Sequence, residues 1–325
     1  MTLTRRHFLA FSAAAAAVVP FVAFSGKEKS ELVRWTGRVL GRDGEIRLYH
    51  GDGAIAREAM AAATVELTRL EAIFSLSRPG SALVRLNQQG RLDAPPPDLV
   101  RVLGEAALVS QLSGGSFDVT VQPLWLLHAS SRKRTGLAPS PAELAAARSL
   151  LGGIQFDQHR IILPRPGMAV TLNGLVQGYL CDRVSEVLAQ HGIIHSLVDL
   201  GTRLASGPSP WPVSIRDPRH RTVPLRRLDL AQGAMASSEA LSSSFPGYGK
   251  YGHLIEPFSG EPALAVPSVT VWASSAMRAD ALSTAIAVAG PARAAAILAA
   301  GGAARGMLVA EDGTITEFCP QECPA

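Results

Sequence analysis

The sequence predicts a mixed α+β fold in which helices and strands alternate without a repeating βαβ unit. Apolar residues three and four positions apart indicate amphipathic helices, and short apolar runs indicate strands. Neither an internal repeat nor a GxGxxG or P-loop motif is present. The chain has 325 residues, 47% of them hydrophobic, which is enough for a large core. No linker is evident, so we expect a single domain over residues 26–325.

The first 25 residues resemble a twin-arginine export signal. The stretch "RRHFL" supplies the charged head, an Ala/Val/Phe run follows it, and Ala23 and Ser25 provide small residues for cleavage before Gly26. A membrane anchor is the alternative, but the run is rich in Ala and broken by Pro20, so it would span a bilayer poorly. Export by this route predicts a mature chain that begins near Gly26 and acts in the periplasm.

The first half of the remaining chain begins with a strand over residues 45–50. A long helix follows, and the loop "RPGS" (78–81) ends it. Asp98 follows a proline-rich loop and is expected to cap a helix over residues 99–113. Residues 130–141 are polar and contain Pro, which favours a surface loop. The apolar stripe of the long helix consists of Met60, Ala63, Leu67, Leu70 and Phe74.

The second half alternates short strands with three helices. A helix is expected from Leu175 to about His191, with Gly192 ending it. Another follows the strand at 268–274 and contains Asp280, and a last helix precedes the final strands. Strands are expected at 154–157, 160–163, 168–172, 193–200, 212–218, 268–274, 306–310 and 314–318.

Charge and aromatic content argue against a nucleic-acid partner. The formal net charge is only +4, there is no run of five Lys or Arg, and only four Trp and four Tyr are available for stacking on bases. Of the three cysteines, Cys181 lies in a helical stretch and is expected in the core. Cys319 and Cys323 suggest a small disulfide in an oxidising compartment, or a metal site, which the lack of a nearby His disfavours.

The segment "ADALST" (279–284) carries an acid and two hydroxyls within an otherwise apolar helix. Asp280 and Thr284 are four residues apart and therefore project from one face. Their oxygens suit Mg²⁺ or Ca²⁺ better than zinc. Alternatively, the Thr284 hydroxyl bonds back to the Asp280 carbonyl and the carboxylate faces water. The apolar neighbours favour the metal site, because an unpaired buried carboxylate is costly.

Three other segments carry groups with two interpretations each. Gly174 and Gly178 lie where a strand leads into a helix. Either they let an anion approach the helix N-terminus, where a free main-chain carbonyl could also bind a metal, or they are needed only for the turn. Asp118 accepts hydrogen bonds from a heterocyclic ring, or caps its own turn. His253 is a general base or a structural histidine.

In this order the segments resemble the ApbE family, the FAD:protein FMN transferases. The segment "FSLSRPGSALVRLN" (74–87) is also similar to that family. Five family motifs have counterparts here. Gly114–Leu124 matches the segment T/S-G-G-x-F-D-x-T-V-x-P-L, Thr171–Asp182 matches the glycine turn, and Val198–Gly201 matches the strand V-N/D-L-G. His253–Pro262 matches the loop H-I-I-D-P-x-T-G-x-P, and Ala279–Thr284 matches the helix A-D-A-L-S-T.

The resemblance implies an ApbE-like fold and a defined reaction. The family uses Mg²⁺ and moves the FMN half of FAD onto a Ser or Thr hydroxyl of an exported or membrane-bound flavoprotein, releasing AMP. Respiratory flavoproteins, including those of ion-pumping oxidoreductases and of nitrous oxide reduction, are its usual acceptors. Metal ions supply the charge neutralisation that attack on a diphosphate requires.

The resemblance also assigns roles to residues. Asp280 and Thr284, helped by the main-chain carbonyl of Val176, would hold the metal. His253 would be the base for the acceptor hydroxyl, and Asp280 would be a catalytic residue as well as a metal ligand. Contacts to the cofactor would come from Leu40, Ser75, Ser77, Asp118, Gln177 and Leu254.

Several positions depart from the family pattern. Ser77 stands where an aromatic residue would stack on the flavin, and Trp125 is a candidate for the missing ring. These departures keep two further hypotheses open: a flavin-binding assembly protein that has lost catalysis, and an FAD pyrophosphatase activity of the same site. The other departures are Leu40-Gly41-Arg42 for M-G-T, Thr171, Asn173 and Gln177 in the glycine turn, Thr202-Arg203 for Gly-Asp, and Glu256 and Ser259 in the His253 loop.

Overall fold

A computed structural model describes residues 31–220, 222–240 and 252–320. The expected export signal (1–25), the expected start of the mature chain at Gly26 and the second terminal cysteine, Cys323, lie outside the described residues. Within the described ranges, no helix is both long and apolar enough to cross a bilayer.

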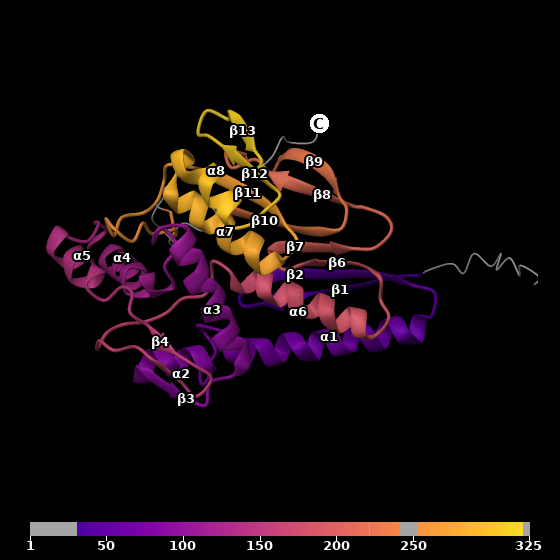
Figure 1. The fold of residues 1–325 in the computed structure, drawn as a ribbon, viewed down its shortest axis with the longest axis horizontal. Helices are drawn as coiled ribbons and strands as arrows, with labels where there is room; N and C mark the ends of the chain where they lie inside the picture. Colours follow the sequence, from indigo (N-terminus) through magenta and orange to yellow (C-terminus); the bar gives the residue numbers. More distant parts are fainter. Residues whose placement is uncertain (1–30, 221, 241–251, 321–325) are drawn as a thin grey trace, which may run out of the picture.

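An eight-stranded sheet forms the centre of the molecule (Figure 1). Its order is β1-β2-β6-β7-β10-β11-β12-β13, and every neighbouring pair is antiparallel. The strands are β1 (Glu31–Val39), β2 (Arg42–His50), β6 (His195–Asp199), β7 (Thr202–Ser206), β10 (Gly233–Glu239), β11 (Ser268–Ala273), β12 (Arg305–Val309) and β13 (Ile315–Phe318).

The two faces of this sheet are covered by different elements. Side chains alternate between the faces of a strand, so Val198 of β6 joins the main core while its neighbour Leu197 joins a separate cluster. That second cluster lies under the hairpin of β8 (Trp211–Arg216) and β9 (Pro224–Leu230). Helices cover the other face: α1 (Gly53–Phe74), α6 (Val176–Gln190), α7 (Ala276–Ala289) and α8 (Pro291–Ala300).

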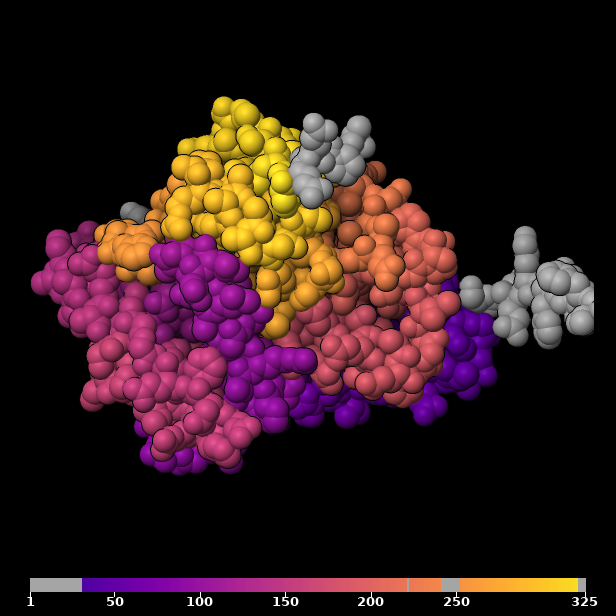
Figure 2. Space-filling view, in the orientation of Figure 1, coloured from indigo at the N-terminus to yellow at the C-terminus, as the bar shows by residue number. Residues whose placement is uncertain are grey.

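Residues between α1 and α6 form one end of the molecule, coloured purple to magenta in Figure 2. This part contains a small sheet, ordered β3-β5-β4, and four helices. The elements are α2 (Ala82–Gln89), β3 (Arg91–Asp93), α3 (Pro97–Leu112), the 3₁₀ turn η1 (Val119–Val121), α4 (Gln122–Thr135), α5 (Pro141–Arg148), β4 (Gln155–Phe156) and β5 (Arg160–Ile162).

The long helices and most strands agree with the sequence-based expectations, with three exceptions. Asp98 does not cap α3; it lies in the first turn and binds Arg69 and the Tyr179 hydroxyl instead. The segment expected as a loop over 130–141 is helical as far as Thr135, because α4 is polar on its exposed side and gives little periodic signal. The segment at 168–172 is not a strand. Cys181 is buried with a free thiol, as predicted.

Candidate functional site

A pocket of about 400 Å³, the central pocket, lies where the segments singled out in the sequence meet. The N-terminal part of α6, the middle of α7, the turn around Asp118 and the loop after residue 252 all contribute to its wall. Six of the predicted site residues line it: Asp118, Gln177, His253, Leu254, Asp280 and Thr284.

Helices α6 and α7 approach closely enough to share main-chain contacts. A Cβ atom on Gly178 would stand 2.2 Å from the Ala276 carbonyl oxygen, so only glycine fits there. One turn later, the Asp182 carboxylate accepts hydrogen bonds from the Ser275 hydroxyl and the Ala276 and Met277 amides at 2.8–3.0 Å. Asp182 thus caps α7 from a neighbouring helix.

The Asp280 carboxylate is buried between these two helices, and only 9% of the residue is exposed. The Gly178 amide donates to its Oδ2 at 3.0 Å. Burial raises the pKa of Asp280 to about 6, against the opposing effects of the Gly178 amide, the Arg42 charge and the Thr202 hydroxyl. The alternative in which this carboxylate faces water is therefore wrong.

The Thr284 hydroxyl is directed away from its own helix. It lies 3.3 Å from the Gly174 carbonyl and 3.1 Å from the Ser238 hydroxyl. The bond back to the Asp280 carbonyl is made by Ser283, at 2.9 Å, and not by Thr284. Thr284 therefore presents its oxygen beside a main-chain carbonyl from the glycine turn, as a metal ligand would.

These oxygens fit a hard divalent cation. One buried carboxylate, one hydroxyl and one carbonyl from the glycine turn converge on the pocket. No cluster of three His, Cys, Asp or Glu side chains exists within the described ranges. A zinc site with several such ligands is thus absent from this part of the chain, whereas Mg²⁺ needs few protein oxygens because it keeps water and substrate ligands.

Asp118 caps its own turn, and it also lines the central pocket. Its Oδ1 accepts from the Thr120 amide at 2.7 Å and from the Thr120 hydroxyl at 2.6 Å. This pairing fixes the carboxylate in one orientation. Trp125, four residues beyond Val121, lines the same pocket from α4.

The loop that carries His253 is held in place by its own turn. The Glu256 carboxylate accepts hydrogen bonds from the Phe258 and Ser259 amides at 3.0 and 2.6 Å. The Gly260 carbonyl lies 2.8 Å from the ring of the buried His128. Glu256, one of the departures from the family pattern, therefore serves the turn that positions His253 at the pocket.

Four predicted residues do not line the central pocket. Val176 is the first residue of α6, and the nearby carbonyl that faces Thr284 is that of Gly174. The Ser75 hydroxyl accepts from the Ser77 amide, and Leu76 between them lines the pocket instead. The fourth, Leu40, lies in the turn between β1 and β2.

Three pocket residues carried no functional signal of their own in the sequence. Thr202 and Arg42 were visible only as departures from a family motif, and both act on Asp280. Ser238 belongs to β10, whose sequence "GAMASSE" has weak strand propensity, and its hydroxyl lies 2.7 Å from that of Ser283. Only the pairing of β10 with β7 and β11 brings it to the site.

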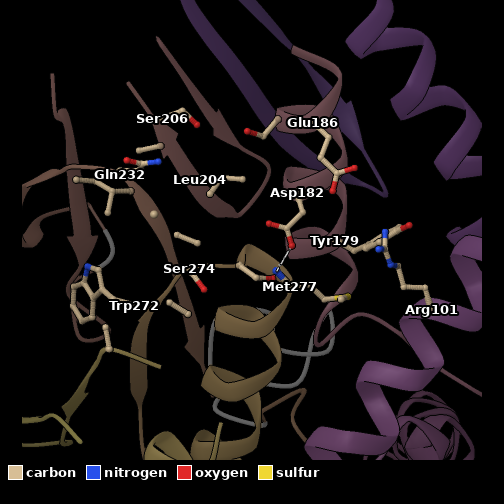
Figure 3. A pocket seen from close by; sticks show the side chains of 18 residues that line it. Arg101, Tyr179, Asp182, Glu186, Leu204, Ser206, Gln232, Trp272, Ser274 and Met277 are labelled. Atoms are coloured by element: carbon tan, nitrogen blue, oxygen red, sulfur yellow. Dashed lines mark hydrogen bonds between the residues drawn. The ribbon is translucent and has the colours of Figure 1, made fainter. Parts of the chain in front are cut away.

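A larger cavity of about 830 Å³ lies at the other end of β7 and β10 from the central pocket. Figure 3 shows side chains that line it. Trp272, Leu204 and Gln232 line one side, and Asp182 and Glu186 of α6 the other. None of the predicted site residues lines it. The Asp182 carboxylate, which is only partly buried, is engaged with the N-terminus of α7.

Comparisons with known proteins identify the family of this chain. The model of the ApbE family matches residues 40–306. The FAD:protein FMN transferase of Haemophilus influenzae is 29% identical over 81% of this chain and 82% of its own length. That of Salmonella typhimurium is 28% identical, with 88% and 87% covered.

Solved structures show the same arrangement of helices on a large antiparallel sheet. The flavin transferase ApbE from Vibrio cholerae superposes with a TM-score of 0.78 at 26% identity, covering 89% of this chain and 97% of the other. The apo form of the Pseudomonas stutzeri flavinyl transferase ApbE gives a TM-score of 0.73 at 27% identity, with 89% and 96% covered. The predicted α+β fold is confirmed.

Proposed function

The chain belongs to the ApbE family, and on that premise we propose that it is an FAD:protein FMN transferase. The reaction is transfer of the FMN half of FAD to a Ser or Thr hydroxyl of an exported or membrane-bound acceptor protein, with release of AMP. It depends on Mg²⁺. The observation that carries the proposal is the buried Asp280 carboxylate beside the Thr284 hydroxyl and the Gly174 carbonyl in one pocket.

Asp280, Thr284 and a main-chain carbonyl of the glycine turn hold the cation in this proposal. The carbonyl expected from the family resemblance is that of Val176, and the Gly174 carbonyl of the same turn lies beside the Thr284 hydroxyl. A bound Mg²⁺ neutralises negative charge on the diphosphate. The positive charge of the bound cation also compensates the negative charge of the Asp280 carboxylate. This explains why the protein keeps a buried acid whose burial would otherwise be costly.

The transfer exchanges the phosphoanhydride bond between the two halves of FAD for a phosphoester bond to the acceptor. The acceptor hydroxyl oxygen forms a bond to the phosphorus atom of the FMN half, and the bond from that phosphorus to the AMP oxygen breaks. His253, which lines the pocket, accepts the hydroxyl proton, and AMP leaves with its phosphate. Asp118 orients the flavin through the carboxylate oxygen that does not cap the turn, and Trp125 supplies the ring that Ser77 lacks.

The site of action in this proposal is the periplasm. The resemblance of residues 1–25 to a twin-arginine signal supports it, because that route carries folded proteins across the membrane. The acceptor is accordingly a flavoprotein with a domain on that side of the membrane.

A second candidate is a flavin-binding assembly protein without transferase activity. Ser77 at the position of the family's stacking residue, outside the lining of the central pocket, favours it. The intact Asp280 and Thr284 pair favours the enzyme, because flavin binding alone needs no metal at the diphosphate.

Intact-mass measurement of an acceptor domain separates these functions. The purified chain is mixed with FAD, Mg²⁺ and the acceptor, and transfer adds the mass of an FMN moiety to the acceptor. Asp280→Ala should abolish the gain, whereas Asp157→Ala, which removes a carboxylate from the turn between β4 and β5, should not. FAD binding without labelling would support the assembly protein, and release of FMN and AMP without acceptor would support the pyrophosphatase. Equal labelling by wild type and Asp280→Ala would refute the metal assignment.

A further inference from the structure

The turn between β1 and β2 places an arginine at the beginning of β2. Leu40 and Gly41 have φ values of 51° and 80°. Two successive positive φ values are typical of the two-residue hairpin loop that suits the twist of antiparallel strands. Val39 and Arg42 pair directly across this loop. The turn thus determines both the position of Arg42 and the face of the sheet on which it starts.

Arg42 shares its face of β2 with the core. Residues two apart in a strand lie on the same side, so Arg42 is on the side of Gly44, Ile46 and Leu48. Ile46 and Leu48 are fully buried, and a Cβ on Gly44 would stand 2.7 Å from the Leu200 side chain. Arg42 is therefore the charged end of an otherwise buried row that faces the helices.

The side chain of Arg42 reaches the central pocket across a glycine. Gly201 has a φ of 99°, and a Cβ built on it would lie 3.8 Å from Arg42 Cδ and 4.0 Å from Gln177 Cγ. Arg42 lines the central pocket and also an adjoining groove of about 760 Å³, the arginine groove. Asp280, whose carboxylate belongs to the candidate metal site, lines the same central pocket.

Two of the other arginines that line the arginine groove already have acidic partners. Arg34 pairs with Glu45 at 2.6 Å, and Arg203 pairs with Asp199 at 2.8 Å. Arg42 forms no ion pair with any residue in the described ranges, although it is exposed. Its donors are thus available to an anionic ligand, whereas those of Arg34 and Arg203 are already engaged.

We infer that Arg42 forms an anion subsite at the junction of the central pocket and the arginine groove, and that it binds a phosphate oxygen of the FAD diphosphate. The inference rests on the proposed function for the identity of the ligand. A guanidinium matches a phosphate with two parallel hydrogen bonds, which a threonine at this position could not provide.

The subsite acts during the transfer as well as during binding. When the bond to the AMP oxygen breaks, negative charge accumulates on the departing phosphate. A cation already fixed beside the diphosphate lowers the free energy of that charge without reorganising. Arg42 therefore contributes to kcat in addition to FAD affinity, and its replacement should affect both.

Binding of two flavins tests the inference. FAD carries the diphosphate, and riboflavin carries the same ring without phosphate, so titration of flavin fluorescence with each separates the phosphate contact from the ring contact. Arg42→Ala and Arg42→Thr should weaken FAD binding by roughly tenfold or more and leave riboflavin binding unchanged, because a charged hydrogen bond contributes at least that factor. Arg42→Lys should recover part of the loss. Arg91→Ala removes the same charge from the small sheet, where Arg91 pairs with Asp93, and should behave as wild type.

Three results are distinguishable. FAD affinity and kcat that are unchanged in Arg42→Ala would overturn the inference and leave the proposed transferase intact. Equal loss of FAD and riboflavin would also overturn it, because it would show a role in pocket shape instead of phosphate binding. If Arg42→Ala selectively loses FAD affinity and the wild-type protein labels no acceptor, the subsite is supported and the proposed function is refuted.

Discussion

Replacing Asp280 by Asn removes a buried charge and keeps the shape of the side chain, so we expect the variant to be more stable than wild type without divalent cations. The Asn oxygen can still accept the hydrogen bond from the Gly178 amide. Burial raises the pKa of Asp280 from 3.8 to about 6. A difference of about two pKa units corresponds to about 3 kcal/mol in the free energy of unfolding.

The pH dependence follows from the direction of this pKa shift. Between pH 3.8 and about 6 the folded state keeps a proton that the unfolded state has lost. The stabilisation by that proton is complete below pH 3.8 and is lost as the pH rises through about 6. Wild type and Asp280→Asn should therefore have similar stability at low pH and differ by about 3 kcal/mol near neutral pH.

Urea denaturation at several pH values, with and without Mg²⁺, measures this difference. Mg²⁺ should stabilise wild type and not the variant, because only wild type presents an ionised carboxylate to it. Asp43→Asn is the control: its side chain is 95% exposed, and its free energy of unfolding should stay within about 0.5 kcal/mol of wild type. If wild type and Asp280→Asn unfold at the same urea concentration at pH 8 without metal, the carboxylate is not desolvated and the reasoning fails.

Gly178→Ala should destabilise the fold by about 3 kcal/mol or more, because the added methyl group meets the Ala276 carbonyl; thermal unfolding checks it, and a stable variant would contradict the close helix contact. Gly104→Ala, in a helix with open space around it, should instead be neutral or stabilise by up to about 1 kcal/mol in the same assay. Asp182→Ala removes the cap of α7 and should cost about 2 kcal/mol in urea denaturation. Thr284→Val should keep the fold by circular dichroism and weaken Mg²⁺ binding in calorimetric titration, whereas unchanged Mg²⁺ affinity would exclude this ligand.

Those parts of the candidate site that depend on local geometry could be predicted from the sequence. Helical spacing alone places Asp280 and Thr284 on one face, and the glycine turn is evident from its composition. Asp98 shows where local rules fail, because its carboxylate is taken by Arg69 of another helix instead of by its own helix N-terminus. Competition between a local and a long-range partner has no local signature in the sequence.

The sequence by itself determined the periodic elements, the α+β class and the oxygen-bearing face of the helix around Asp280. Periodicity is a local property, and each of these features follows from residues a few positions apart. Only the tertiary structure decided which groups meet: the Gly178 amide and Asp280 are 102 residues apart, and the Gly174 carbonyl and Thr284 are 110 apart. Such contacts depend on how closely two helices pack, which here is set by the absence of a side chain at Gly178.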